Sequence, residues 1–455
     1  MAFGNISDFR EILSRVANHK DYRWSIASSY AHMLLNIVVQ ILLVPLYLHY
    51  LGKVQFGVLM IVLASINYLG LGLGWASSGA QRIMGEKYTE GKTDELQRVF
   101  GLSKIIFFFY AALLTSSGVL VVWGADTALF PNDPVLRHDV IDMLLVGIVY
   151  VIVLYDLNVD RLLLMAIGKQ AYANILSLIS LTVFAILTIV TLMNGGGLVQ
   201  IMGAQLLGAL CARGVSYFML RRLALRPRFP QNDEWQTLRR LLGPMGIGYG
   251  LYGALLLTLL QADTLLLGLL LGAAVVADYV LIWKIADVAM QALWRLPESL
   301  TPYLVHMDVK GEHQRMRSIY FTARRAMFAL AGVVGLAYAV LGPYIVQLWV
   351  GPENAPDAPW AYVLAGGALF WMVVARLPAV FAYSTVKLKP LVHVTALETI
   401  LKIGFVLISI STLGLYAPLI AINIIHIFGV AILYQKLSDK CGLGPMDRNT
   451  KNVSH

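Results

Sequence analysis

Long apolar runs recur along almost the whole chain, and they limit its fold more than any other feature of the sequence. A helix of ~20 apolar residues is long enough to cross the hydrocarbon core of a bilayer. Charged residues make up only 13% of the 455 residues, whereas soluble globular proteins carry about 25%. The first run begins at Trp24 and has the length of a full span, so it predicts a membrane helix and not a cleavable signal. The sequence therefore predicts an all-α membrane protein without a large soluble domain.

Twelve membrane-spanning helices can be assigned from these runs. Their predicted ranges are 24–50, 55–76, 100–124, 143–167, 171–193, 198–220, 241–270, 276–300, 325–350, 360–385, 390–412 and 415–435. Because the number of spans is even, both ends of the chain are expected on the same side of the membrane.

The Lys and Arg residues are distributed very unevenly among the segments between these spans. If the N-terminus is cytoplasmic, 26 of the 35 fall on the cytoplasmic side, two (Lys53 and Arg137) fall outside, and seven lie within spans. Cytoplasmic loops of membrane proteins carry such an excess of basic residues, so both termini are predicted to be cytoplasmic. The same asymmetry explains the net charge of +9 without a nucleic-acid partner.

The two halves of the chain align at a constant shift of 220 residues. Gly52 follows the first span and Gly272 follows the seventh, while Gly91 and Gly311 lie in corresponding polar loops. Each half has an even number of spans, so the halves insert in the same orientation, as parallel repeats. In transporters built from such repeats, the substrate site lies near the middle of the membrane, between the repeats. The predicted organisation is an N-terminal six-helix bundle at 1–222, a basic cytoplasmic linker at 223–240, a C-terminal six-helix bundle at 241–436 and a cytoplasmic tail at 437–455.

The eighth predicted span carries a polar face that is hard to reconcile with lipid. Its members recur every three or four residues: Lys284, Asp287, Gln291, Arg295 and Glu298. On a helix this spacing places all five on one face. A charge at the centre of a lipid-facing helix costs ~2.5–3.5 kcal/mol or more. The polar face is therefore predicted to line a bundle interior or a water-filled cavity.

Acidic residues within other spans are candidates for coupling transport to H⁺ or Na⁺. Asp156 and Asp160 lie one turn apart on one face of the fourth span, and two carboxylates at this distance in a low-dielectric gap can form a proton site. A salt bridge from Asp156 to Arg376, which occupies the aligned position in the other half, is the alternative interpretation. Further coupling candidates, each on a different span, are Asp287, Asp263 and Glu398.

Several polar residues within spans also have a purely structural interpretation. Glu398 and Lys402 are four residues apart and can neutralise each other on one helix. Lys104 and Arg213 can extend to the membrane surface. Asn36 and Gln40, on the first span, can form hydrogen bonds between helices or line a cavity.

Motifs of an enzyme or of an ATP-driven pump are not found in the sequence. The glycines at 195–197 are not followed by the Lys-Ser/Thr pair of a phosphate-binding loop. His, Cys and Asp residues do not show the spacing of a metal site. The two cysteines, Cys211 and Cys441, do not indicate a disulfide framework. We therefore expect a protein that is not an enzyme and has no cofactor beyond a coupling ion.

A set of short motifs in the first half carries a family resemblance. These motifs are Pro45 late in the first span, Leu51-Gly52 and Phe56-Gly57 in the short loop after it, "LGLGLG" at 69–74, and Gly168-Lys169 between the fourth and fifth spans. With them, the chain resembles the polysaccharide flippases, the Wzx-type branch of the multidrug/oligosaccharidyl-lipid/polysaccharide exporter superfamily. The resemblance implies a MATE-like exporter fold of twelve spans in two six-helix bundles.

The resemblance also implies a function in the bacterial cytoplasmic (inner) membrane. Such flippases move undecaprenyl-diphosphate-linked oligosaccharides from the cytoplasmic to the periplasmic leaflet by alternating access, for O-antigen, exopolysaccharide or capsule. The implied partners are this lipid-linked substrate, membrane lipids, a polysaccharide polymerase and a chain-length regulator.

The residues themselves indicate how such a substrate would be bound. A diphosphate needs cationic partners inside the membrane, and the sugars need hydrogen-bonding groups and aromatic faces. Arg295 is expected near the cytoplasmic mouth and Lys284 nearer the periplasm, with Asp287 holding Lys284 when no substrate is bound. The candidate substrate-binding residues are Lys284, Arg295, Arg376, Lys402, Gln291, Asn36, Gln40 and Trp294.

Three other functions stay open at this point. A multidrug exporter of the same superfamily would move organic cations, and its site would be acidic, whereas seven basic residues lie within these spans. A flippase of lipid-linked peptidoglycan precursors would have more spans than the twelve assigned. A scaffold or lipid scramblase of a polysaccharide assembly complex would not need the polar face of the eighth span.

Overall fold

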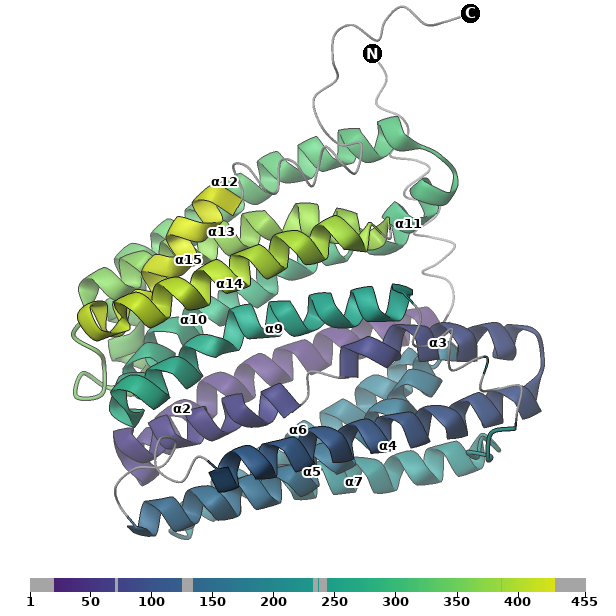
Figure 1. The fold of residues 1–455 in the computed structure, drawn as a ribbon, viewed down its shortest axis with the longest axis horizontal. Coiled ribbons are helices and arrows are strands. Elements are labelled where there is room, and N and C mark those ends of the chain that lie inside the picture. The colour runs from purple at the N-terminus through teal and green to yellow at the C-terminus, as the bar shows by residue number, and fades with distance from the viewer. Residues whose placement is uncertain are drawn as a thin grey trace, which may run out of the picture. The chain divides into compact units, whose positions relative to one another are not determined.

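The protein is all-helical over the residues that its computed structural model describes, which are 20–69, 73–124, 134–231, 236, 244–385 and 387–429. The helices follow one another as α2 (Lys20–Leu69), α3 (Leu73–Thr89), α4 (Thr93–Gly124), α5 (Pro134–Ala166), α6 (Gln170–Met193), α7 (Leu198–Arg222), α9 (Pro244–Leu271), α10 (Ala273–Glu298), α11 (Thr301–Val309), α12 (His313–Val350), α13 (Pro359–Ser384), α14 (Leu388–Leu413) and α15 (Tyr416–Phe428) (Figure 1). The predicted fold class is confirmed.

Within the described residues, nine helices are long and apolar enough to cross a membrane. The difference from the twelve predicted spans has three sources. The first two spans form one long helix, α2, in which Gly52 takes a non-helical conformation with φ 79°. α10 is apolar on average but holds too many charged residues for an apolar span, and the described part of the last span, α15, has only 13 residues. The chain is therefore a multi-pass membrane protein.

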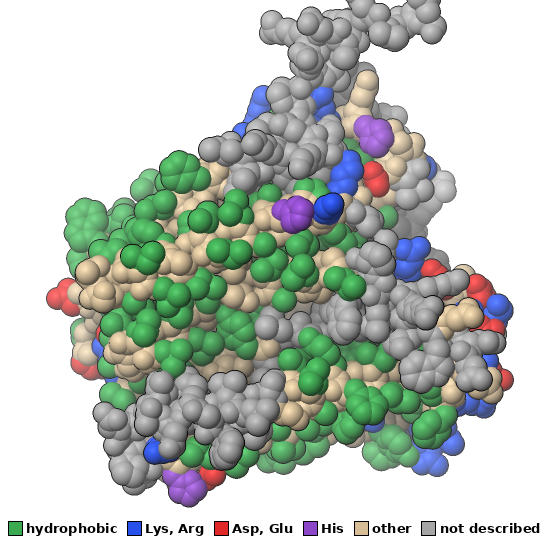
Figure 2. All heavy atoms as spheres, viewed as in Figure 1, with side chains coloured by type: hydrophobic (Ala, Val, Ile, Leu, Met, Phe, Trp, Pro, Cys, Tyr) green, Lys and Arg blue, Asp and Glu red, His purple; other side chains and the backbone are tan. Residues whose placement is uncertain are grey.

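The outward-facing side chains of these helices suit a lipid environment. Phe109, Val333 and Ile408 are 68%, 68% and 83% exposed. On the face shown in Figure 2, hydrophobic side chains cover the sides of the helices, and charged side chains gather toward the helix ends. Continuous exposed apolar surface of this kind marks a membrane-facing region.

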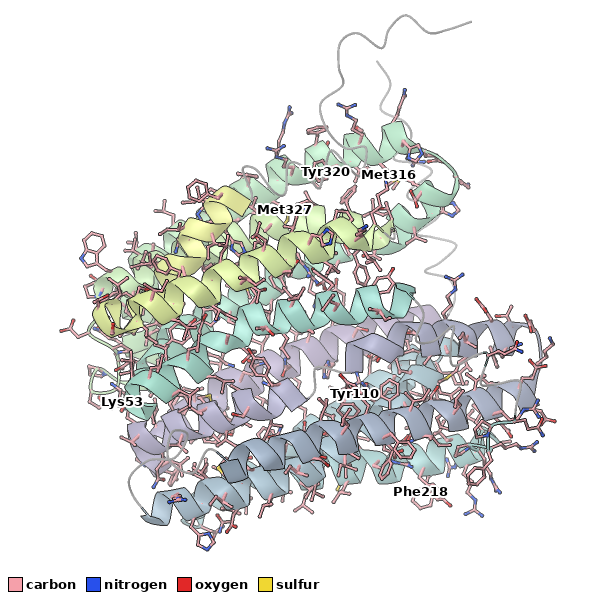
Figure 3. All side chains as sticks on the ribbon, in the orientation of Figure 1. Lys53, Tyr110, Phe218, Met316, Tyr320 and Met327 are labelled. Carbon is pink, nitrogen blue, oxygen red and sulfur yellow. The ribbon has the colours of Figure 1, made fainter. Side chains whose placement is uncertain are left out.

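Contacts divide the chain into two units that differ from the predicted bundles in one segment. Of the described residues, the first unit holds α2 up to Tyr50 and α3 to α7, and the second holds the rest of α2, from Leu51 to Leu69, with α9 from Ile247 and α10 to α15. The helix after Gly52 joins the second unit because it packs on the start of α10. Gly57 lies so close to the Ala273 carbonyl that a Cβ would overlap it, and the Lys53 Nζ lies 2.6 Å from the Asp278 Oδ1 (Lys53 is labelled in Figure 3).

The 220-residue repeat is confirmed by the geometry of the turns. Gly52 and Gly272 have nearly the same backbone conformation, φ 79° and ψ 169° against φ 92° and ψ 172°. Gly91 and Gly311 also have positive φ, 72° and 70°. Each accepts a hydrogen bond through its carbonyl from the amide two residues later, at 3.1 Å and 2.8 Å. These two pairs of corresponding turns therefore have the same backbone geometry.

One helix forms the centre of each unit. In the first unit, α5 packs against α3, α4, α6 and α7. In the second, α13 packs against α10, α11, α12, α14 and α15, and most of its residues are buried. A cluster of buried side chains that includes Tyr320 and Phe381 fills the space between α12, α13 and neighbouring helices. These central helices carry Asp156, Asp160 and Arg376, so each unit builds polar groups into its core.

Candidate functional site

A pocket of about 450 Å³ lies within the second unit. Its walls come from the part of α2 after Gly52, from α9, from α10 and from α13. The residues that line it are Met60, Leu63, Ala64, Asn67, Leu260, Gln261, Thr264, Tyr279, Val280, Trp283, Lys284, Asp287, Met290, Gln291, Trp294, Arg295, Glu298 and Arg376. All five polar residues of the predicted face on the eighth span are among them.

The amphipathic sequence of α10 explains why these side chains reach the pocket. Apolar residues on its other face, such as Leu281, Ile282 and Ala286, are fully buried. This face packs against α12 and α13. Burying it turns the polar face toward the space beside α9 and the second part of α2, which is the pocket.

A carboxylate between two guanidinium groups forms one end of the pocket. The Arg376 Nη2 donates to the Glu298 Oε1 at 2.6 Å, and the Arg295 Nη1 lies 3.2 Å from the Glu298 Oε2. The Arg376 Nη1 also donates to the Tyr252 hydroxyl at 3.2 Å. Glu298 therefore holds both arginines in place and partly neutralises them.

An aromatic ring supports the same arginine. The Arg376 guanidinium lies 4.6 Å from the centre of the Trp294 ring, a cation–π arrangement. The Trp294 Nε1 donates to the Met372 carbonyl of α13 at 3.2 Å, which fixes the orientation of the ring. Both side chains line the pocket, so an aromatic face and a cation are presented together.

Lys284 differs from the other cations of the pocket. We expected Asp287 to hold it, but the Asp287 Oδ2 accepts a hydrogen bond from the Gln291 Nε2 at 2.8 Å instead. Within the described part of the chain, the Lys284 ammonium donates no hydrogen bond and forms no ion pair. Lys284 and Asp287 therefore form no direct hydrogen bond or ion pair, although their opposite charges still attract each other across the pocket face of α10.

The charges in the pocket favour an anionic ligand. Three of the lining side chains are cationic (Lys284, Arg295 and Arg376) and two are anionic (Asp287 and Glu298), which leaves one positive charge in excess. A half-buried cation without a partner is unfavourable unless an anion or water compensates it. An anionic group could bind Lys284 directly and exchange with Glu298 at the arginines.

The remaining substrate-binding candidates lie outside this pocket. The Lys402 Nζ donates to the Asp263 Oδ2 at 2.7 Å and to the Leu259 carbonyl, and its side chain is only 1% exposed. The Tyr279 hydroxyl donates to the same Asp263 oxygen at 2.8 Å. Lys402 is thus neutralised by Asp263 of α9 and not, as expected, by Glu398 on its own helix.

Asn36 and Gln40 belong to the other unit. Both lie in the part of α2 before Tyr50 and are half-buried. Neither lines the pocket described above. A role for them in substrate binding stays a prediction.

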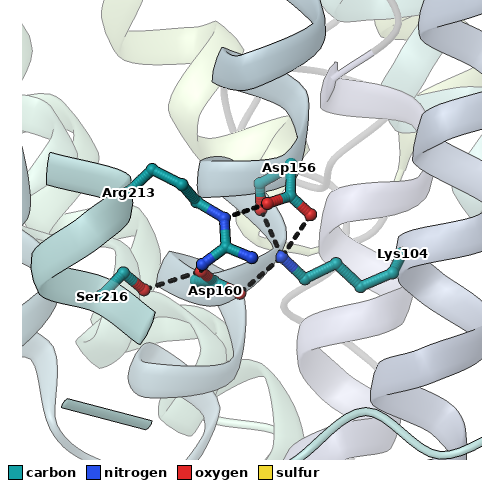
Figure 4. A network of polar contacts seen from close by, with 5 residues as sticks. All are labelled: Lys104, Asp156, Asp160, Arg213 and Ser216. Atoms are coloured by element: carbon teal, nitrogen blue, oxygen red, sulfur yellow. Dashed lines mark hydrogen bonds and ion pairs between the residues drawn. The ribbon is translucent and has the colours of Figure 1, made fainter. Parts of the chain in front are cut away.

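The two carboxylates of the fourth predicted span form a closed network in the first unit (Figure 4). The Lys104 Nζ lies 2.5 Å from the Asp156 Oδ1 and 2.6 Å from the Asp160 Oδ1. The Arg213 guanidinium also contacts both carboxylates, with its Nη1 3.2 Å from the Asp160 Oδ2. The Ser216 hydroxyl donates to that oxygen at 2.7 Å. Each negative charge is therefore balanced inside the unit.

This network corrects two expectations from the sequence. Arg376, the expected partner of Asp156, forms its ion pair with Glu298 instead. Lys104 and Arg213, expected to reach the membrane surface, turn inward because the two carboxylates attract them, and their side chains are 14% and 30% exposed. A charge count within each half would have pointed to partners inside the same half: apart from Arg161, the N-terminal half holds two acidic and two basic residues within its spans.

The protein is similar to known proteins in structure and not detectably in sequence. No protein family model matches the sequence, and no curated protein is significantly similar to it. An inward-facing multidrug resistance MATE family transporter of the MOP superfamily has a TM-score of 0.73 and 16% identity, covering 89% of this chain and 94% of that chain.

Two further solved structures are similar at comparable length. MATE in its bent conformation has a TM-score of 0.64 and 15% identity, covering 94% of this chain and 97% of that chain. A MOP superfamily transporter from Pyrococcus furiosus has a TM-score of 0.62 and 16% identity, covering 92% of this chain and 93% of that chain. The chain therefore has the fold of the MATE transporters, as its sequence predicted.

Proposed function

We propose that the protein is a flippase for oligosaccharides linked to undecaprenyl diphosphate. It moves them from the cytoplasmic to the periplasmic leaflet of the bacterial inner membrane, with both of its own termini in the cytoplasm. The proposal is supported by the MATE-type fold, by the sequence resemblance in the first half and by the charge of the pocket. The observation that carries it is Lys284, a cation in the pocket that forms no ion pair within the described residues.

The pocket offers separate groups for the two chemical parts of such a substrate. Lys284 and Arg295 lie eleven residues apart on α10, or ~16 Å along the helix, about half of the ~30 Å hydrocarbon core. A diphosphate could pass between them and would find a cation at both depths. Trp294, Asn67 and Gln261 line the same pocket and offer an aromatic face and amides to sugars. The lipid tail stays in the bilayer.

Anion exchange lowers the energetic barrier of each step. Removing the ion-pair partner of a charge inside a membrane costs several kcal/mol of free energy, because the desolvation of the charge is then no longer compensated. At the arginines, Glu298 already neutralises the site before the substrate arrives, so the diphosphate replaces one anion with another. At Lys284, the substrate supplies the direct ion pair that Asp287, which attracts the lysine without contacting it, does not.

A multidrug exporter is the second candidate, because several solved structures with this fold are named multidrug transporters. Asp287 and Glu298 are the carboxylates that an organic cation would use, and Asp156, Asp160, Asp263 and Glu398 stay candidates for H⁺ or Na⁺ coupling. The P. furiosus transporter is described as having a binding pocket of reverse polarity, which suggests a different function. The excess of cations in the present pocket favours an anionic substrate.

Loss of function in cells separates the two candidates. We expect depletion of the protein to cause lipid-linked oligosaccharide to accumulate on the cytoplasmic leaflet and surface polysaccharide to fall. Lys284→Ala and Arg295→Ala should fail to restore export while reaching the membrane at normal levels. Arg315→Ala is the matched control for Arg295, because Arg315 forms the same i,i+3 pair with Glu312, at 3.3 Å, outside the pocket. Normal polysaccharide with raised ethidium retention would instead identify a multidrug exporter.

A further inference from the structure

A second pocket, of about 390 Å³, lies in the first unit where α7 ends. It is separate from the pocket of the second unit and shares no residue with it. Its walls come from α4, α5, α7 and the segment that follows α7. Four of its ten lining residues are basic and one is acidic: Lys104, Arg213, Arg221, Arg226 and Asp160.

Two of these four cations are in excess. Lys104 and Arg213 are neutralised by Asp156 and Asp160 in the network of Figure 4. In the described part of the chain, the side chains of Arg221 and Arg226 form no ion pair and donate no hydrogen bond. The pocket therefore carries about two positive charges that no described side chain neutralises.

The segment that carries Arg226 is fixed in position. The Gln97 Nε2 of α4 donates to the Ala224 carbonyl at 2.9 Å, and the Arg228 amide donates to the Gln97 carbonyl at 3.1 Å. The Arg228 Nη1 also lies 2.9 Å from the Asp94 Oδ1. Since these contacts anchor the chain on both sides of Arg226, less conformational entropy is lost when a ligand binds there.

The residues around the pocket indicate that its anion comes from the membrane–water interface. Tyr217 of α7 lines the pocket and is 53% exposed, and the next residue, Phe218, is 64% exposed (Phe218 is labelled in Figure 3). Exposed aromatic residues beside basic ones are typical of the membrane–water interface. The basic residues place this end of the unit on the cytoplasmic side, where anionic lipid headgroups attract Lys and Arg.

We propose that this pocket binds a phosphate group, and that the phosphate belongs to the headgroup of an anionic phospholipid. The phosphate bridges Arg221 of α7 and Arg226 of the following segment, while Tyr217 and Leu220 contact the start of the acyl chains. The site binds lipid whether or not the protein is a flippase.

The test measures binding of dioctanoyl phosphatidylglycerol to the purified full-length protein by native mass spectrometry. We expect Arg221→Ala and Arg226→Ala each to weaken binding about fivefold, and the double variant about thirtyfold. Arg222→Ala is the matched control, because Arg222 is an exposed neighbour with the same charge that does not line the pocket, and its binding should be unchanged. A variant with Lys at both 221 and 226 should keep most of the binding.

Three results would overturn the proposal. The first is equal binding by wild type and by a folded double alanine variant. The second is a loss in Arg222→Ala as large as that in Arg221→Ala, which would indicate a diffuse surface charge. The third is inorganic phosphate competing as strongly as the lipid, which would assign the site to a soluble phosphate. Lys284→Ala should leave lipid binding intact, so failure of this proposal is distinguishable from failure of the flippase proposal.

Discussion

At the scale of single residues, the charged side chains within the membrane are of two kinds. Lys402 and Asp263 form a closed pair, each at most 2% exposed, and Tyr279 donates a hydrogen bond to the same carboxylate oxygen as Lys402. Lys284 lines a pocket and forms no such pair among the described residues. The first arrangement favours stability, and the second leaves a cation available to a ligand.

The closed pair predicts a large loss of stability when one partner is removed. Lys402→Met leaves the Asp263 charge buried and uncompensated, which should destabilise the protein by about 3–5 kcal/mol. Lys53→Met is the control, because Lys53 pairs with Asp278 at 35% and 25% exposure, where a pair is worth about 1 kcal/mol or less. The measurement is the temperature at which half of the detergent-purified protein stops eluting as a single species. Equal shifts in the two variants, or no recovery in Asp263→Asn/Lys402→Met, would contradict this assignment.

At the scale of helices, two contacting glycines set the distance between α12 and α13. A Cβ on Gly366 of α13 would overlap the Gly335 carbonyl of α12, and a Cβ on Gly335 would lie 2.7 Å from the Gly366 carbonyl. Gly332, one turn away on α12, has its nearest neighbouring atom, on Phe370, at 4.0 Å. The same substitution should therefore have opposite effects at Gly366 and at Gly332.

Gly366→Ala should destabilise the protein by about 1–3 kcal/mol, since the two helices must move apart. Gly332→Ala should stabilise it by up to about 1 kcal/mol, because Ala favours the helix over Gly and fits without overlap. Thermal unfolding of the two purified variants checks this. A Gly366→Ala protein as stable as wild type would show that α12 and α13 are further apart than described.

The sequence predicted the polar face of a single helix but not the contacts between helices. The periodicity of α10 was sufficient to place all five polar residues on one face and to predict that this face lines a cavity. Periodicity within a helix does not determine which residue of another helix lies opposite. The partners of Asp156 and Lys402 were therefore missed, since they come from α4, α7 and α9 and depend on how those helices rotate and pack.

At the scale of the whole molecule, the sequence was sufficient for the fold class and for the repeat, whose glycine turns match at the 220-residue shift. The assignment of residues 51–69 to the second unit was missed, because it depends on packing against α10 and not on the order of the spans. The orientation in the membrane follows from the distribution of Lys and Arg alone and stays a prediction.

Single cysteines test this orientation in a variant that has Ser at positions 211 and 441. With cells intact, an impermeant maleimide should label Asp357→Cys, in the loop between α12 and α13. It should label Glu90→Cys, in the turn between α3 and α4, and Gln314→Cys, in the first turn of α12, only after permeabilisation, because the positive-inside rule places both in the cytoplasm. Labelling of Gln314→Cys in intact cells would reverse the topology.

Transfer of a defined substrate by purified protein tests the central claim most directly. Proteoliposomes would contain an undecaprenyl-diphosphate disaccharide, and a galactosyltransferase outside the vesicles would report each molecule that reaches the outer leaflet. Wild type and Arg315→Ala should transfer the lipid. Lys284→Ala and Arg295→Ala should be about ten- to a hundredfold slower, as expected for loss of a charge-assisted contact, and Lys284→Arg should retain part of the rate. If both alanine variants reconstitute normally and transfer at the wild-type rate, the pocket on α10 is not the substrate path.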